Sequence, residues 1–144
     1  MKGRFSQRAK EVIEYSQIIS AELGSGFVGT EHILLGLVEV KEGVAAKALE
    51  LQNVTKEDVL EKVKSISGIA DSSIFKDPQD FTPRTKRLLE LSFQESIIMG
   101  NAYIGTEHLL LAILHEKNCM AIRILISLKV NPQRLYDEIM NLLG

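Results

Sequence analysis

At 144 residues, the chain is long enough for one compact domain with a substantial core, or for two small units that share one. Hydrophobic residues make up 45% of the sequence and charged residues 25%, which is typical of a soluble globular protein and excludes a disordered one. The formal net charge of −2 and the lack of a long run of Lys or Arg argue against a nucleic-acid partner.

The single cysteine, Cys119, rules out an intrachain disulfide and a thiolate metal cluster, and we expect it to pack as a small apolar residue. The first residues are polar, and the apolar runs are shorter than a membrane span. We therefore expect a cytoplasmic protein with no membrane association and no cofactor in this chain.

The sequence repeats itself at an offset of 76 residues, the step from Phe5 to Phe81. Residues 5–68 align with residues 81–144 without a gap, and the block Gly-Thr-Glu-His occurs at 29–32 and again at 105–108. This predicts a first repeat at 1–68, a linker at 69–80 and a second repeat at 81–144. Because one copy alone buries little apolar surface, we expect both copies to form one compact domain about a pseudo-twofold axis.

Each copy opens with apolar residues spaced three and four apart, which predicts an amphipathic helix. In the first copy these residues are Ala9, Val12, Ile13, Ile19 and Leu23. Ser6 and Thr82 are the expected N-caps, with Pro83 in the first helical position. Gly24 and Gly100 are the expected helix stops.

Three further helices are expected in each copy. The second begins at an N-cap, Thr30 or Thr106, and the third covers 44–51 or 120–128. The fourth follows a cap at Thr55 or Asn131 and ends before Gly68 or Gly144. Since no stretch alternates like a strand, the sequence predicts an all-α fold of eight helices, arranged as two pseudo-twofold four-helix repeats.

Longer motifs surround the duplicated block. It is followed by Ile-Leu-Leu-Gly-Leu in one copy and Leu-Leu-Leu-Ala-Ile in the other, and the copies open with Arg-Phe-Ser-Gln-Arg-Ala and Phe-Thr-Pro-Arg-Thr-Lys. This pattern resembles the Clp N-terminal repeat domain, and Gly-Val-Ala-Ala-Lys-Ala-Leu makes it most similar to the ClpC type of Gram-positive bacteria. The resemblance implies a regulatory domain that receives adaptor proteins and substrates for a hexameric AAA+ unfoldase, which feeds the ClpP peptidase.

The motor itself is not expected in this sequence, because it contains no Gly-x-x-x-x-Gly-Lys-Ser/Thr phosphate loop. Neither ATPase nor peptidase activity is expected, and we expect the isolated domain to be a monomer. The alternative is a free-standing accessory protein that binds a Clp complex. A reading frame that continues past Gly144 into a phosphate loop would favour the first interpretation.

The resemblance also implies a receptor for phosphoarginine-tagged or unfolded substrate proteins. It assigns the guanidinium to Glu31 and Glu107 and the phosphate to the helix starts at Ser6 and Thr82, with Arg4 as an added cation. We expect the Glu31 site to be the tighter one, because Asp80 is the counterpart of Arg4 in the second repeat. The alternative is that both glutamates only favour the helix dipole, an effect of about 0.3–1 kcal/mol each.

Two further residue pairs have open roles. Phe5 and Phe81 are either hydrophobic staples of the first helices or part of an exposed groove for adaptor or peptide. His32 and His108 are expected to be structural hydrogen-bonding groups. Because His115 has no repeat partner, the sequence predicts neither a symmetric metal site nor a histidine-based catalytic triad.

Overall fold

The computed structural model describes residues 4–67 and 80–144, and these residues form eight helices and no strand. The helices are α1 (Gln7–Glu22), α2 (Thr30–Glu39), α3 (Val44–Leu51), α4 (Lys56–Ser67), α5 (Pro83–Ile98), α6 (Thr106–His115), α7 (Met120–Ser127) and α8 (Pro132–Leu143). The predicted all-α fold is confirmed. Gly68 and the predicted linker, apart from Asp80, lie outside the described residues.

The long first helices of the two repeats begin and end as their sequences predict. The Ser6 hydroxyl accepts the Ala9 N–H at 3.2 Å, and the Thr82 hydroxyl accepts the Thr85 N–H at 3.1 Å. Beyond the other ends, Gly24 and Gly100 have φ of +67° and +72°, a left-handed conformation that favours glycine. Local capping therefore fixes where α1 and α5 start and stop.

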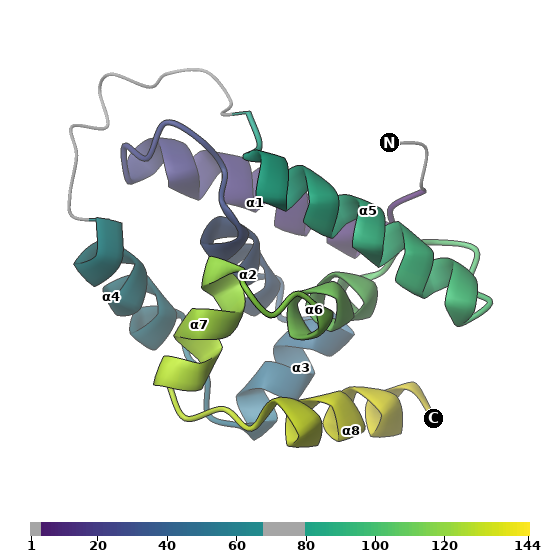
Figure 1. Cartoon of the computed structure of the whole chain (residues 1–144). Helices are drawn as coiled ribbons and strands as arrows, with labels where there is room; N and C mark the ends of the chain where they lie inside the picture. Colours follow the sequence, from purple (N-terminus) through teal and green to yellow (C-terminus); the bar gives the residue numbers. More distant parts are fainter. Residues whose placement is uncertain (1–3, 68–79) are drawn as a thin grey trace.

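The two repeats are interlocked rather than simply adjacent (Figure 1). Helix α8 of the second repeat packs on α3 of the first, and α4 of the first repeat packs on α7 of the second. Helix α2 contacts α1, α3 and α4 of its own repeat and α5, α6 and α7 of the other. The fourth helix of each repeat therefore covers the third helix of its partner.

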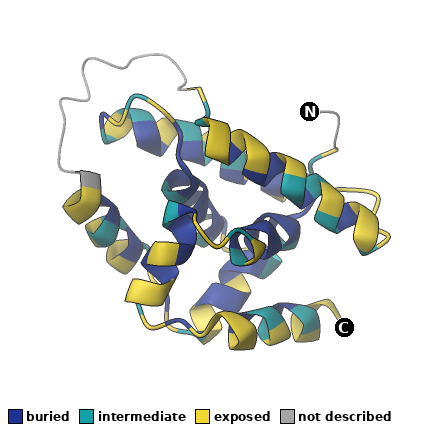
Figure 2. Ribbon diagram, in the orientation of Figure 1, coloured by how far each residue is buried: buried dark blue, intermediate teal, exposed yellow. Residues whose placement is uncertain are grey.

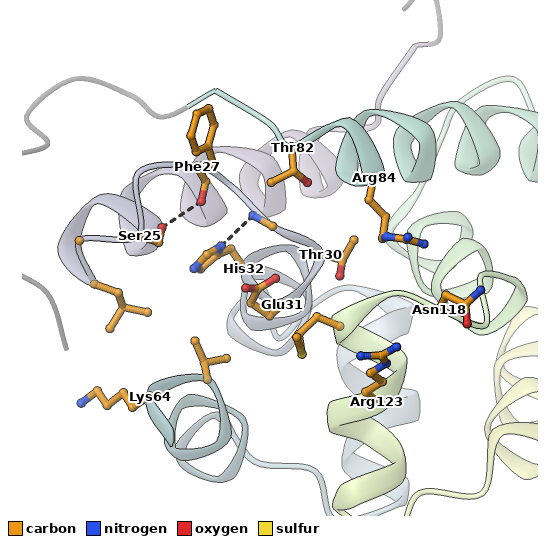
Figure 3. A pocket seen from close by; sticks show the side chains of 15 residues that line it. Ser25, Phe27, Thr30, Glu31, His32, Lys64, Thr82, Arg84, Asn118 and Arg123 are labelled. Atoms are coloured by element: carbon orange, nitrogen blue, oxygen red, sulfur yellow. Dashed lines mark hydrogen bonds between the residues drawn. The ribbon is translucent and has the colours of Figure 1, made fainter. Parts of the chain in front are cut away.

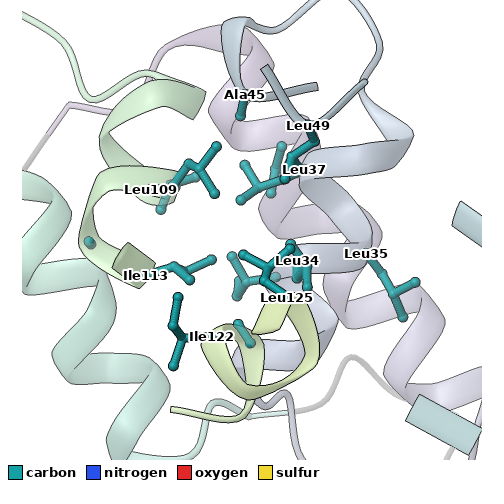
Figure 4. Packing of buried hydrophobic residues seen from close by; sticks show 14 of the residues in the cluster. Leu34, Leu35, Leu37, Ala45, Leu49, Leu109, Ile113, Ile122 and Leu125 are labelled. Atoms are coloured by element: carbon teal, nitrogen blue, oxygen red, sulfur yellow. The ribbon is translucent and has the colours of Figure 1, made fainter. Parts of the chain in front are cut away.

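One apolar core joins the repeats, and its buried residues lie on the inner faces of the helices (Figures 2 and 4). Leu34, Leu37 and Leu49 come from the first repeat, and Leu109 and Ile113 from the second. Each of these side chains is fully buried, which is worth about 1.5–3 kcal/mol for a side chain of this size. The buried residues of both copies thus belong to one apolar cluster.

Backbone hydrogen bonds also tie the start of each repeat to the other. Ser6 donates its N–H to the Ile104 carbonyl at 2.8 Å, and the Ile104 N–H is donated to the Arg4 carbonyl at 2.6 Å. In the same way, Val28 donates to the Asp80 carbonyl at 2.8 Å and Thr82 donates to the Val28 carbonyl at 3.0 Å. These pairs place the start of each repeat's first helix beside the Gly-Thr-Glu-His block of the other repeat.

Candidate functional site

The histidine of each block holds the start of its own helix. Gly29 donates its N–H to His32 Nδ1 at 2.9 Å, and Gly105 donates to His108 Nδ1 at 2.8 Å. Since Nδ1 accepts, the neutral His108 ring carries its proton on Nε2, which donates to Asn101 Oδ1 at 2.8 Å. Burial lowers the pKa of both histidines, which favours this neutral form. The expected structural role of both rings is confirmed.

The threonine of each block caps a helix of the other repeat. The Thr30 hydroxyl accepts the N–H of Ala121 in α7 at 3.1 Å, and the Thr106 hydroxyl accepts the N–H of Ala45 in α3 at 3.2 Å. All four groups are buried. The prediction that Thr30 and Thr106 cap their own helices is therefore wrong, because Gly29 and Gly105 occupy those N-cap positions.

The glycine of each block makes room for the glutamate. Gly29 has φ −94° and ψ 175°, which any residue can adopt, but a Cβ there would collide with Oε1 of Glu31. A Cβ on Gly105 would collide with Oε1 of Glu107 in the same way. Each carboxylate is thus folded back against the backbone at the start of its helix, where the helix dipole favours negative charge.

Glu31 lines a cavity of about 670 Å³ between the repeats (Figure 3). Thr82 at the start of α5 lines the same cavity, together with the basic side chains Lys64, Arg84 and Arg123. Glu31 lies between Lys64 on one side and the two arginines on the other in the view of Figure 3. A carboxylate and several cations in one cavity suit a ligand that carries charges of both signs.

Glu107 lines the corresponding cavity, of about 870 Å³, together with Ser6. The sequence left open which helix start faces which glutamate. Each glutamate faces the helix start of the other repeat, because the backbone pairs at Ile104 and Val28 cross between the repeats.

Arg4 does not supply the cation predicted for the Glu31 cavity. Its backbone pairs with Ile104, on the Glu107 side, and its side chain is exposed and lines neither of the two cavities. Asp80 accepts the Phe81 N–H at 2.8 Å and lies 3.7 Å from Lys86 Nζ. The basic residues of the Glu31 cavity were not predicted from the sequence. The identical repeat pair Arg8 and Arg84 could have indicated Arg84.

Phe5 and Phe81 come together in one groove. They line a cavity of about 530 Å³ with Ile13 and Leu89, and two Lys and two Glu residues also line it: Lys10, Lys86, Glu14 and Glu90. Both rings are half-buried and pack against the core. The two aromatic residues therefore contribute to the core and also line an apolar groove between α1 and α5.

Other kinds of site are not apparent in residues 4–67 and 80–144. In this part of the chain, no group of three or more His, Cys, Asp or Glu residues is arranged to bind a metal ion. Among the same residues, no helix is long and apolar enough to span a bilayer. Cys119 is buried, as expected, and burial raises the pKa of its thiol.

The fold and the paired cavities define an internally duplicated, all-helical binding domain. The family of the Clp repeat (R) N-terminal domain matches residues 4–128 and 80–144, and the chain belongs to this family, as its motifs indicated. The chain is 39% identical over 144 residues to "Negative regulator of genetic competence ClpC/MecB" of Bacillus subtilis, a match that covers all of this chain and 18% of that protein. The chain thus spans about a fifth of the length of this curated relative.

Solved structures show the same fold. The N-terminal domain of the chaperone ClpD from Arabidopsis thaliana matches with a TM-score of 0.79 and 29% identity over 98% of both chains. The ClpV N-domain in complex with a VipB peptide matches with a TM-score of 0.73 and 19% identity, covering 96% of this chain and 88% of that one. At that identity, the ClpV likeness concerns the fold alone.

Proposed function

We propose that this chain is the adaptor- and substrate-binding domain of a ClpC-type ATP-dependent unfoldase, and that it recognises proteins tagged with phosphoarginine for the ClpP peptidase. Membership of the Clp repeat family supports the first part, and ClpC/MecB is the kind of protein whose N-terminal region it resembles. In this role the chain binds and does not catalyse.

The observation that carries the phosphoarginine proposal is the composition of the Glu31 cavity. A carboxylate held over Gly29 lies in the same cavity as Arg84, Arg123 and the start of α5. The guanidinium of phosphoarginine pairs with a carboxylate, and its phosphate pairs with cations and with the free N–H groups at a helix start. Both halves of the ligand therefore find a partner of opposite charge.

Glu107 and Ser6 occupy the equivalent positions in the second cavity. The carboxylate of Glu107 is folded back over Gly105, and Ser6 presents the start of α1. Both cavities thus combine a folded-back glutamate with a helix start, but α5 begins with Pro83, which has no N–H to donate, whereas α1 begins with Gln7, and the surrounding side chains also differ.

The groove between Phe5 and Phe81 is the proposed surface for an adaptor or an unfolded segment. Its centre is apolar and its edges carry both Lys and Glu, which suits an apolar side chain in a polar peptide. The ClpV N-domain, which has the same fold, holds a VipB peptide in its own complex.

Isothermal titration with free phosphoarginine tests the proposal. We expect saturable binding, and we expect Glu31→Gln to weaken it about tenfold or more, because a charge-assisted pair contributes about 1.5–3 kcal/mol. Glu50→Gln is the matched control, since Glu50 is an exposed acid that lines none of the three cavities described here. Absence of binding, or equal losses in both variants, would refute phosphoarginine recognition at this site.

A further inference from the structure

The two repeat-related cavities carry opposite charge. Three basic side chains and one acid line the Glu31 cavity: Lys64, Arg84, Arg123 and Glu31. One basic side chain and three acids line the Glu107 cavity: Arg8, Glu11, Glu42 and Glu107. The buried histidine in each cavity is held in its neutral form and does not change this balance.

Substitutions between the two repeats produce this difference. Glu42 in the second cavity corresponds to Asn118 in the first, so one acid is replaced by an amide. Arg123 corresponds to Lys47, which does not line the Glu107 cavity. Lys64 corresponds to Met140, so this cation has no counterpart. The glutamates and the capping hydroxyls of Ser6 and Thr82 are common to both cavities, whereas the surrounding charges differ, and Pro83 leaves the Glu31 cavity with one backbone N–H fewer.

The charges of the Glu31 cavity are available to a ligand. Arg123 is exposed and forms no ion pair with any residue in the described part of the chain. Arg84 lies 3.8 Å from Glu116, but Glu116 also lies 3.4 Å from Arg87, so two arginines share one carboxylate. The excess of positive charge around Glu31 is therefore not neutralised by this ion pair.

We propose that a phosphorylated arginine side chain binds only in the Glu31 cavity, and that the Glu107 cavity rejects it by charge. This inference rests on the proposed function. A phosphate adds about 1.5 to 2 negative charges at neutral pH, which Arg84 and Arg123 attract and which Glu11 and Glu42 repel. The guanidinium that pairs with either glutamate is the same, so the phosphate decides between the cavities. Each domain then carries one phosphorylated side chain.

The first test is titration with free phosphoarginine, combined with backbone amide NMR to locate the ligand. We expect one ligand per domain, with shifts at Gly29 and Thr82 rather than at Gly105 and Ser6. Glu31→Gln should weaken binding about tenfold or more, and Glu107→Gln should leave the affinity within about twofold. Two equal sites, or a larger loss from Glu107→Gln, would overturn the inference and leave the proposed function standing.

Absence of binding in the native chain would refute the proposed function as well. Free arginine is the control ligand, because it lacks the phosphate. We expect it not to displace phosphoarginine at equal concentration, and equal competition would overturn the role assigned to the cations.

Variants of single charges test the mechanism. Arg123→Gln should weaken phosphoarginine binding about three- to tenfold, the scale of one charge-assisted contact. Lys47→Gln, at the repeat-equivalent position outside the Glu107 cavity, should change nothing. The double variant Glu11→Gln with Glu42→Asn should create a second, weaker site in the Glu107 cavity. A double variant that still binds one ligand would overturn charge as the reason for the exclusion.

Discussion

The crossed threonine caps predict that the stability of each repeat depends on the other. Replacing Thr30 by Val keeps the shape of the side chain but leaves the buried Ala121 N–H without its partner at 3.1 Å. Loss of a helix N-cap costs about 0.5–2 kcal/mol, and a buried unpaired donor costs about 1–3 kcal/mol. We therefore expect Thr30→Val to lower the free energy of unfolding by about 1–2 kcal/mol, and Thr106→Val to do the same through Ala45.

Urea unfolding followed by circular dichroism measures this effect, and the thermal midpoint should fall by about 2–4 °C per kcal/mol. Thr55→Val is the matched control, because the Thr55 hydroxyl caps its own helix by accepting the exposed Asp58 N–H at 3.1 Å. Water can replace that bond, so the control should lose less. If Thr30→Val lost no more stability than Thr55→Val, the cap between the repeats would not contribute as argued.

Three further predictions follow from the site and the core. Burial lowers the pKa of His32, so the contribution of the neutral ring to stability is complete above the unfolded pKa of about 6.5 and is lost as pH falls below it. The variant His32→Gln can still accept the Gly29 N–H but does not titrate. Its urea midpoint should therefore fall less than that of the native chain between about pH 7.5 and 5.5. Gly29→Ala should displace the Glu31 carboxylate and weaken phosphoarginine binding more than it lowers the thermal midpoint, and an unchanged affinity would contradict this role of the glycine. The isolated domain should be monomeric by light scattering because the repeats bury their apolar faces against each other, and a stable hexamer would contradict this.

The helices could be predicted from the sequence because their signals are local. Ser6, Thr82 and Asn131 are caps whose hydrogen bonds lie within three residues, and Gly24 and Gly100 end helices by their own backbone conformation. Because the two copies align without a gap, the helices predicted in the first copy also predict those of the second. Such signals do not depend on which repeat packs against which.

The composition of the cavities could not be predicted in the same way. The duplication shows that Ser6 and Thr82 are equivalent, but it does not show which glutamate each one faces. A helix start could face the glutamate of its own repeat or that of the other repeat, and the sequence is compatible with both arrangements. The backbone bridges at Ile104 and Val28 distinguish them. The expectation that the Glu31 site binds phosphoarginine more tightly depended on Arg4, which the structure does not bring to Glu31. The basic residues that line the Glu31 cavity now give the reason for that expectation.

This crossing makes the site a property of the duplicated unit rather than of one repeat. Glu31, Thr30 and Lys64 come from the first repeat, whereas Thr82 and Arg123 come from the second. In each block the glycine positions the glutamate, the histidine holds the helix start, and the threonine caps the other repeat. The same four residues thus join the repeats and build the cavity. Because a single repeat lacks one side of each cavity, the cavities exist only where two copies interlock, and the copies could then diverge in charge without losing the fold.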